Sequence, residues 1–166
     1  MITFIIALIP FLNTYNQPNK ILYWTTLLSL DNSIVITAID EIDRFTWVGT
    51  SEGLYRINKS NFKIWLMKVN NSKLPDNYIT SIACDAEGRT YVGTRNGILY
   101  WDHYAFILIN TENSKLPENH ITCLEFDHDG NLLIGTRNAG LFKGIGRDVK
   151  PFKLVIMKTT FNQMCK

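Results

Sequence analysis

The sequence has few of the residues from which reactive sites are built. Its 166 residues include three cysteines and three histidines, and there is no Cys-x-x-Cys pair, Gly-x-Ser-x-Gly motif or glycine-rich loop before a helical pattern. These absences argue against a zinc site, a serine hydrolase and a phosphate-binding loop. The formal charge is only +2, which gives no support for a nucleic-acid-binding surface. We therefore expect no cofactor, no metal site, no catalytic residue and no nucleic-acid partner.

Long apolar runs are also scarce. One opens the chain at residues 1–12 (MITFIIALIPFL) and is too short to cross a bilayer, which takes about 20 residues. It is similar to the apolar core of a secretory signal peptide, although no lysine or arginine precedes it and no A-x-A cleavage pattern follows it. We expect residues 1–20 to be a signal peptide or an apolar amino-terminal segment, with a buried strand as the alternative, and no membrane span in this chain.

The sequence does contain one unit three times. NSKLPDNYIT begins at Asn71, NSKLPENHIT begins at Asn113, and a more divergent copy (LDNSIVITAI) begins at Leu30. A Gly-Thr pair occurs once in each copy, at Gly49-Thr50, Gly93-Thr94 and Gly135-Thr136. The steps between these pairs are 44 and 42 residues. Such a period is typical of propeller blades and of some helical repeats.

The composition of each copy favours strands. Short runs rich in Ile, Val, Thr, Tyr and Trp alternate with turn residues, and no stretch keeps a helical apolar stripe. The second copy predicts strands at Ile79–Cys84, Arg89–Thr94, Ile98–Asp102 and Ala105–Asn110, with turns at Asp85–Gly88 and Arg95–Gly97. Asn-Gly in the second turn favours a type I′ hairpin, which needs positive φ at both central positions.

We therefore predict an all-β fold of about three four-stranded antiparallel β-propeller blades. The blades are expected at about residues 34–67, 78–110 and 120–157, within a propeller region at 21–158. Propellers close with about four to eight blades, so the ring is expected to be incomplete. Residues 21–29 are interpreted as the outer strand of a further blade.

The end of the sequence also follows the repeat. Residues 62–68 (FKIWLMK) are echoed by residues 152–158 (FKLVIMK), and residues 159–166 are interpreted as the truncated start of a next repeat. This pattern predicts an amino-terminal fragment of a longer protein, with a truncated gene product as the alternative.

The repeat resembles the two-component regulator propeller repeat. The shared pattern is L-P-x-N-x-I-T, then D-x-x-G, then a Gly-Thr pair and a glycine-led strand. Matching positions are Leu74-Pro75, Ile79-Thr80, Asp85, Gly88, 91–94 and Gly97, and in the next copy Leu116-Pro117, Ile121-Thr122, Asp127, Gly130, 133–136 and Gly140. The first copy matches at residues 47–50 and 53–55. It departs at Asp31 and Arg44, where proline and glycine are expected, which leaves its turn geometry open.

This resemblance covers about residues 30–158 and implies a function. In that family the repeat builds the periplasmic sensor region of hybrid histidine kinases, notably in gut bacteria that sense polysaccharides. The chain is thus expected to be a non-catalytic, glycan-responsive sensing segment, exported to the periplasm and tethered to the inner membrane in the full receptor. Any kinase activity would lie in a missing carboxyl-terminal part. Expected partners are an oligosaccharide and either the remaining blades of the receptor or a homodimer partner.

Two alternatives remain open at this point. One is a propeller enzyme similar to streptogramin lyase, a family whose chemistry needs a histidine general base and a bound divalent cation. The other is a propeller used only for protein interaction. Among the three histidines, only His120 is predicted near the end of the ring where propellers usually bind ligands. The sensor interpretation is therefore favoured over the lyase.

Blade topology predicts where a ligand would meet the chain. In a four-stranded blade, the loop before the innermost strand and the turn between the second and third strands emerge on the same face. The predicted ligand-binding residues on these segments are Tyr78, Arg95, Asn96, His120, Arg137 and Asn138. Two arginines at equivalent blade positions would suit a sugar carboxylate or sulfate, because guanidinium binds such anions through paired hydrogen bonds. The alternative is that these are solvated turn residues.

Other recurrent or reactive residues are expected to be structural. Cys84, Cys123 and Cys165 occupy non-equivalent positions; we expect buried, inert thiols at Cys84 and Cys123, with a bridge between neighbouring blades as the alternative. The turn at 127–130 corresponds to 85–88 and is expected to be a structural turn and not a metal loop. Two sets of bulky residues are expected in the core: Trp47, Tyr91 and Leu133 at one repeat position, and Phe62, Phe106 and Phe152 on the outer strand.

Overall fold

The structure is a computed structural model that describes residues 33–145 and 148–151. The described strands belong to one compact unit, which begins at Val35. In this part of the chain, no helix is long and apolar enough to cross a membrane. The predictions for residues 1–20, 21–29 and 159–166 lie outside the described residues.

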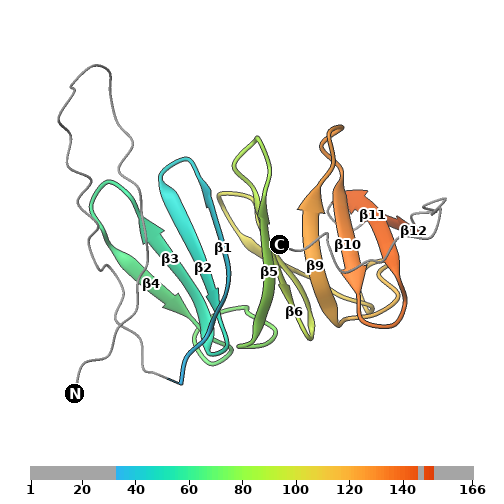
Figure 1. The fold of residues 1–166 in the computed structure, drawn as a ribbon, viewed down its shortest axis with the longest axis horizontal. Coiled ribbons are helices and arrows are strands. Elements are labelled where there is room, and N and C mark those ends of the chain that lie inside the picture. Colours follow the sequence, from blue (N-terminus) through green and yellow to red (C-terminus); the bar gives the residue numbers. More distant parts are fainter. Residues whose placement is uncertain (1–32, 146–147, 152–166) are drawn as a thin grey trace. The chain divides into compact units, whose positions relative to one another are not determined.

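Within the described residues, twelve strands form three four-stranded antiparallel sheets, each in sequence order (Figure 1). Blade 1 consists of β1 (Ile36–Ile42), β2 (Phe45–Thr50), β3 (Gly53–Asn58) and β4 (Ile64–Met67). Blade 2 consists of β5 (Ile79–Cys84), β6 (Thr90–Thr94), β7 (Gly97–Trp101) and β8 (Phe106–Ile109). Blade 3 consists of β9 (Ile121–Phe126), β10 (Leu132–Thr136), β11 (Leu141–Ile145) and β12 (Asp148–Pro151). The predicted fold class is confirmed.

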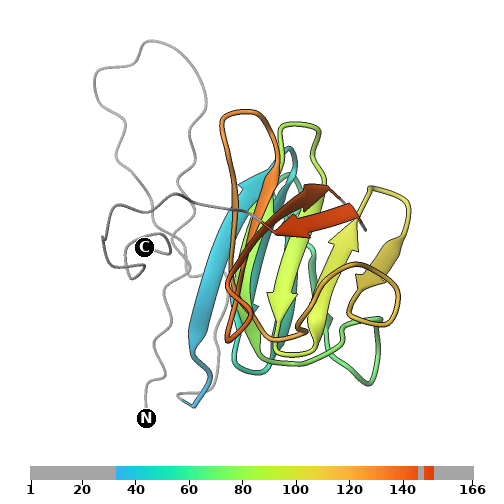
Figure 2. The same ribbon diagram turned by 90° about the vertical axis from the view of Figure 1, so that its right-hand side faces the viewer.

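The three blades stand side by side in chain order (Figures 1 and 2). Their first strands are neighbours and are joined by side chains. The backbone N–H of Cys84 on β5 donates to Asp40 Oδ2 on β1 at 2.8 Å, and the backbone N–H of Leu124 on β9 donates to Ser81 Oγ on β5 at 3.0 Å. Strands β1, β5 and β9 are thus the inner strands. The described sheets form an open row and not a closed ring.

The hydrophobic core lies between the blades and not within any one of them. Trp47, Leu54 and Met67 of blade 1 pack with Ile79 and Trp101 of blade 2 in one cluster. A second cluster joins blade 2 to blade 3, with Tyr91, Ile98 and Ile109 packed against Ile121, Leu124, Leu132, Ile134 and Phe142. Full burial of one such side chain contributes about 1.5–3 kcal/mol. Each blade is therefore stabilised mainly by its neighbour.

The repeated Gly-Thr pair has two separate structural roles. The threonine hydroxyl donates to the backbone carbonyl that follows the next turn, from Thr50 to Gly53 at 2.8 Å and from Thr94 to Gly97 at 2.8 Å. The glycine leaves room for the next blade. A Cβ on Gly49 would lie 2.5 Å from Ile79 Cγ2, and a Cβ on Gly93 would lie 2.9 Å from Ile121 Cγ2. The pair therefore fixes both the turn and the contact between blades.

The structure corrects the predicted type I′ hairpin. Thr94 pairs directly with Gly97, so Arg95 and Asn96 are the two central residues of the turn. Neither belongs to the described residues with positive φ, whereas Gly97, after the turn, has a φ of 121°. The Asn-Gly pair is thus displaced by one residue from the centre that a type I′ turn requires.

One of the predicted core aromatics is also corrected. Phe62 lies in the β3–β4 turn and not on the outer strand, with a φ of 58° and 40% of its surface exposed. Trp47 and Tyr91 are almost fully buried, as predicted. Leu133 is only half-buried, as is Phe106 at the start of β8. Phe152 lies outside the described residues.

The cysteine predictions are confirmed only in part. Cys84 is a free, half-buried thiol, and burial raises its pKa to about 12, so it carries almost no thiolate at neutral pH. Cys123 is disulfide-bonded, so the prediction of an inert thiol is wrong for that residue.

Candidate functional site

Antiparallel order places the turns of the three blades on two opposite faces. We call one the Arg95 face; it carries the β2–β3, β6–β7 and β10–β11 turns and the connections that lead into β5 and β9. The other, the His103 face, carries the β1–β2, β3–β4, β5–β6, β7–β8 and β9–β10 turns. All six predicted ligand-binding residues lie on segments of the Arg95 face: Tyr78, Arg95, Asn96, His120, Arg137 and Asn138.

The loops of the Arg95 face are bonded to one another. The backbone N–H of Gly97 in blade 2 donates to the carbonyl of Asn119, which leads into blade 3, at 2.8 Å. Within blade 3, the N–H of Arg137 donates to the carbonyl of His120 at 3.0 Å. The turn of one blade and the connection into the next are thus held together by backbone atoms. The side chains on them project from a fixed framework.

The connections that lead into β5 and β9 repeat the same set of hydrogen bonds. Asn77 Oδ1 accepts from the N–H of Val69 at 2.9 Å, and Asn119 Oδ1 accepts from the N–H of Thr111 at 2.8 Å. Ser72 Oγ donates to the carbonyl of Lys68, and its counterpart in the next copy does the same. The leucine of each Leu-Pro pair is buried. The N-x-x-x-x-x-N spacing of the motif is therefore a scaffold for the loop.

Arg95 is exposed and packs against an aromatic ring. Its guanidinium carbon lies 3.9 Å from the centroid of the Tyr78 ring, a cation–π contact of the kind that contributes about 0.5–1 kcal/mol at exposed sites. Neighbouring Asn96 donates from Nδ2 to the carbonyl of Pro75 at 3.5 Å. The stacking orients Arg95 and leaves the edges of its guanidinium toward solvent, where an anion could accept from them.

Asn138 is held by a carboxylate in blade 3. Glu118 accepts hydrogen bonds from the backbone N–H groups of Asn138 and Ala139, at 2.7 and 2.9 Å, and from Asn138 Nδ2 at 2.8 Å. The hydrogen bond from the Asn138 N–H is the largest of the effects that lower the pKa of Glu118. The side-chain amide of Asn138 is therefore already engaged within the protein, whereas Arg137 is exposed.

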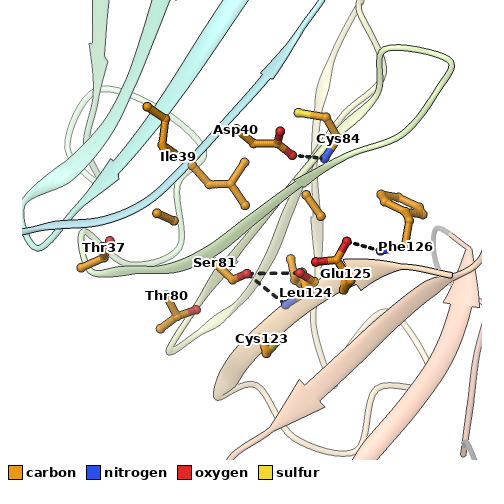
Figure 3. Close-up of a pocket in the computed structure, with 13 residues that line it drawn as sticks. Thr37, Ile39, Asp40, Thr80, Ser81, Cys84, Cys123, Leu124, Glu125 and Phe126 are labelled. Atoms are coloured by element: carbon orange, nitrogen blue, oxygen red, sulfur yellow. Dashed lines mark hydrogen bonds between the residues drawn. The ribbon is translucent and has the colours of Figure 1, made fainter. Parts of the chain in front are cut away.

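The inner strands enclose a second candidate region that the sequence argument missed. A groove of about 510 Å³ runs between β1, β5 and β9, and Asp40, Ser81 and Glu125 are among the polar residues that line it (Figure 3). The hydroxyls of Thr37 and Thr80 are buried and have no hydrogen-bond partner among the described residues. Both threonines belong to the repeated Ile-Thr pair, and this repetition was the available signal.

The histidines are spread over the molecule. His120 lies on the Arg95 face, whereas His103 lies on the opposite face, where its Nε2 is 2.9 Å from the carbonyl oxygen of Glu87. His128 is in the β9–β10 turn, also on the His103 face. Within the described ranges, no group of three or more His, Cys, Asp or Glu residues could hold a metal ion.

The two Asp-x-x-Gly turns are built alike. Asp85 accepts from the backbone N–H groups of Glu87 and Arg89, and Asp127 accepts from those of Asp129 and Asn131. Lys143 lies against the carboxylate of Asp127 and, with the turn donors, holds the pKa of that carboxyl well below its usual range. This carboxylate is committed to the turn, in agreement with the structural role predicted for residues 127–130.

Comparison with known protein families identifies two of the repeats. Residues 73–96 and 115–138 match the family described as "Two component regulator propeller", so both segments are repeats of this kind and the resemblance seen in the sequence is confirmed. Together they span less than half of the chain. No curated protein sequence matches it.

Solved structures show the same fold. The extracellular domain of BT3049 from B. thetaiotaomicron, described as a hybrid two component system, is 23% identical with a TM-score of 0.61, over 72% of this chain and 17% of that one. The extracellular domain of BT4673 from the same organism, described as a one component system, is 23% identical with a TM-score of 0.60, over 82% of this chain and 18% of that one.

A lyase shares the fold as well. Virginiamycin B lyase from Staphylococcus aureus is 13% identical with a TM-score of 0.57, over 74% of this chain and 42% of that one. At these identities the likeness establishes a propeller fold and nothing finer. The chain spans less than a fifth of the length of the two extracellular domains.

Proposed function

We propose that this chain is a ligand-sensing propeller segment of a two-component sensor, located in the periplasm, and that its Arg95 face binds an anionic glycan. The segment itself is non-catalytic in this proposal, and the signalling enzyme belongs to other parts of the receptor. Two repeats of the two component regulator propeller family support the sensor assignment. The extracellular location of the similar domains is consistent with export.

The observation that carries the proposal is the bonded framework of the Arg95 face. Because Gly97 of blade 2 is hydrogen-bonded to Asn119 before blade 3, exposed arginines at equivalent positions of two blades are presented from one continuous surface. Arg95 is oriented by Tyr78. A guanidinium offers two parallel N–H donors to a carboxylate or sulfate. A glycan with such groups on successive units could therefore contact Arg95 and Arg137 together.

The histidine arrangement favours a sensor over a lyase. His103 and His128 lie on the face opposite His120, so the three do not converge on one reacting centre. Likeness to virginiamycin B lyase at 13% identity extends to the fold alone. The described structure therefore offers the lyase alternative no group of three or more metal-ligating residues beside a histidine.

The test is a double substitution, Arg95→Ala with Arg137→Ala, in the full-length protein. We expect affinity for an oligogalacturonate or a sulfated oligosaccharide to fall by about tenfold or more, because charge-assisted bidentate contacts are among the stronger hydrogen bonds. The free energy of unfolding should change by about 0–1 kcal/mol, as is usual for exposed charges. Isothermal titration calorimetry measures the first effect and urea unfolding measures the second.

A matched control removes two positive charges from the opposite face. Lys59→Ala with Lys63→Ala changes the net charge by the same amount. Both lysines lie in the β3–β4 connection on the His103 face, so this variant should leave glycan affinity unaltered. Neutral oligosaccharides of the same length serve as control ligands. Equal affinity for the charged glycans in the wild type and the Arg95/Arg137 variant would contradict the proposal, as would equal losses in the two double variants.

A further inference from the structure

A cluster of aromatic rings surrounds Arg56, near the His103 face of the contact between blades 1 and 2. Arg56 is on β3, and its guanidinium carbon lies 4.6 Å from the ring centroid of Trp65 and 4.9 Å from that of Phe45. The centroids of Trp47 and Trp101 are 5.6 and 5.5 Å away. The guanidinium is thus surrounded by four aromatic rings. Only one of them, Trp101, comes from blade 2.

The charge of Arg56 has no anionic partner in the described structure. Its Nε is buried without a hydrogen-bond partner, and burial lowers the pKa of the guanidinium with no neighbouring carboxylate to oppose the effect. A buried N–H donor without a partner is costly, by about 1–3 kcal/mol and more for a charged group. A bound anion would balance the charge by accepting from the terminal Nη groups, which, unlike Nε, are not among the buried atoms without a partner.

A hollow of about 260 Å³ gives access to this guanidinium. It is lined by the β1–β2 turn, by Arg56, and by Gly88, Trp101 and His103 of blade 2. Its volume is slightly below the range of about 300–1,000 Å³ that is usual for small-molecule sites, and so suits a ligand of one ring. The rings of Phe45 and Trp101 are part of the lining and supply apolar faces against which such a ligand can pack.

The rim of the hollow contains two residues with an uncommon backbone conformation. Asp43 and His103 have φ angles of 51° and 78°, in a region that non-glycine residues seldom adopt. Gly88 lies beneath them: a Cβ added there would be 2.6 Å from His103 Cε1 and 2.7 Å from Asp43 Oδ2. Gly88 therefore leaves room for both side chains at the rim of the hollow. Sparsely populated backbone conformations are often found at ligand sites.

We propose that this hollow is a second ligand site, separate from the Arg95 face, which binds a small carboxylate carried on a single ring. The carboxylate accepts hydrogen bonds from the guanidinium of Arg56, and the ring packs against Phe45 and Trp101. Because blades 1 and 2 both contribute to the lining, an occupied site would also strengthen the contact between them. The ring is either that of a sugar acid or that of an aromatic acid, and the experiment distinguishes the two.

The experiment titrates the full-length protein with D-glucuronate and with benzoate, each beside its neutral counterpart, D-glucose or benzyl alcohol. Calorimetry gives the affinity, and tryptophan fluorescence reports on the rings that surround Arg56. We expect one of the two carboxylates to bind about tenfold or more tightly than its neutral counterpart, and Arg56→Gln to remove that advantage. The control Lys59→Gln loses the same charge outside the lining and should bind as the wild type does.

A second variant tests the site without altering the aromatic cluster. Asp43 is exposed and is the carboxylate at the rim, and asparagine also tolerates positive φ. Asp43→Asn should raise carboxylate affinity by about two- to fivefold because a like charge is removed. Equal binding of carboxylates and neutral ligands, or a folded Arg56→Gln variant with wild-type affinity, would overturn the proposal. If Arg56→Gln does not fold, an affinity that Asp43→Asn leaves unchanged or lowers would overturn it.

Discussion

The turns at Arg95 and at Arg137 occupy the same position in two blades but are stabilised differently. In blade 2, Asp76 Oδ1 accepts from the N–H of Tyr78 at 2.9 Å, within its own loop. In blade 3, the equivalent Glu118 accepts from Asn138 and Ala139, across the gap between two loops. The glutamate is longer by one methylene, which lets its carboxylate reach the neighbouring turn. The same motif position thus carries a local hydrogen bond in blade 2 and a brace between loops in blade 3.

The difference matches the lengths of the two turns. Two residues separate β6 from β7, whereas four separate β10 from β11. The shorter turn has Arg95 stacked on Tyr78, and the longer one has the Glu118 brace. Both keep the threonine hydroxyl bonded to the glycine carbonyl. The hydrogen bond from the threonine to the glycine carbonyl is thus common to both turns. The two blades differ in the side chains that they place on the Arg95 face.

The glycine after each turn gives the sharpest way to test this comparison. Gly97 and Gly140 both have positive φ, but a Cβ on Gly97 would lie 2.7 Å from the carbonyl oxygen of Ile109, whereas a Cβ on Gly140 would meet nothing within 4 Å. We expect Gly97→Val to lower the free energy of unfolding by about 3–5 kcal/mol, from strain and collision together, and Gly140→Val by about 1–3 kcal/mol from strain alone. Urea unfolding measures both, and equal losses would show that the two turns are not packed differently.

The glycines that face the next blade give the second test. A Cβ on Gly93 would meet Ile121 of blade 3 at 2.9 Å, whereas a Cβ on Gly135 would meet Thr122 and Cys123 of its own blade at 3.2 and 3.3 Å. Gly93→Ala should therefore cost about 1–3 kcal/mol of stability, as overpacking usually does, and Gly135→Ala less than about 1 kcal/mol. Hydrogen exchange should rise in both blade 2 and blade 3 in the Gly93 variant, but in blade 3 alone in the Gly135 variant, because Gly135 and the residues that its Cβ would meet all belong to blade 3. Faster exchange in blade 2 of the Gly135 variant, or in one blade alone of the Gly93 variant, would refute this assignment of the contact.

The smallest expected effect on stability comes from the two equivalent carboxylates, Glu118 and Asp76. Glu118→Gln should lower the thermal midpoint, whereas Asp76→Asn should change it less, because Glu118 braces two loops. The pKa of Glu118 is lowered from its ordinary value of 4.5, so its contribution is complete above that value and is lost as the pH falls through the folded-state pKa. The difference between wild type and Glu118→Gln should thus shrink as the pH falls from about 6 to about 3. Thermal unfolding followed by circular dichroism at a series of pH values checks this, and a constant difference would contradict it.

The sequence was sufficient to predict the strands because their positions follow a period. The repeated Gly-Thr pairs set the phase, and β5 begins and ends at the predicted residues, Ile79 and Cys84. Local turn geometry was harder to predict. The Asn-Gly signal was interpreted as the centre of a hairpin, but the pairing of Thr94 with Gly97 decides the register, and that pairing depends on the whole sheet. The repeat pattern predicts an outer strand at Phe62 as well, but the chain turns at this residue, which has a φ of 58°.

The loops of the Arg95 face were predictable from topology, but the Arg56 cluster was not. Arg56 pairs across the sheet with Trp47 and Trp65, whereas the equivalent residues of the other blades are Tyr100 and Lys143, which pair with Tyr91 and Leu133. A residue that occurs in only one copy leaves no periodic signal. Its environment also depends on Trp101 of the next blade, and the sequence alone does not place that ring beside it.

The contact between the glycine of a Gly-Thr pair and an isoleucine of the next blade has an evolutionary consequence. Gly49 receives Ile79 and Gly93 receives Ile121, so both described junctions use the same complementary shape, a glycine on one blade and an isoleucine on the next. A duplicated blade would carry its own isoleucine and its own glycine, and could be inserted at either junction without redesign of the surfaces on each side. Arrays of such units can thus gain or lose members by gene duplication and deletion, because each unit interacts mainly with its nearest neighbours. A shared junction frees the loops to diversify from blade to blade.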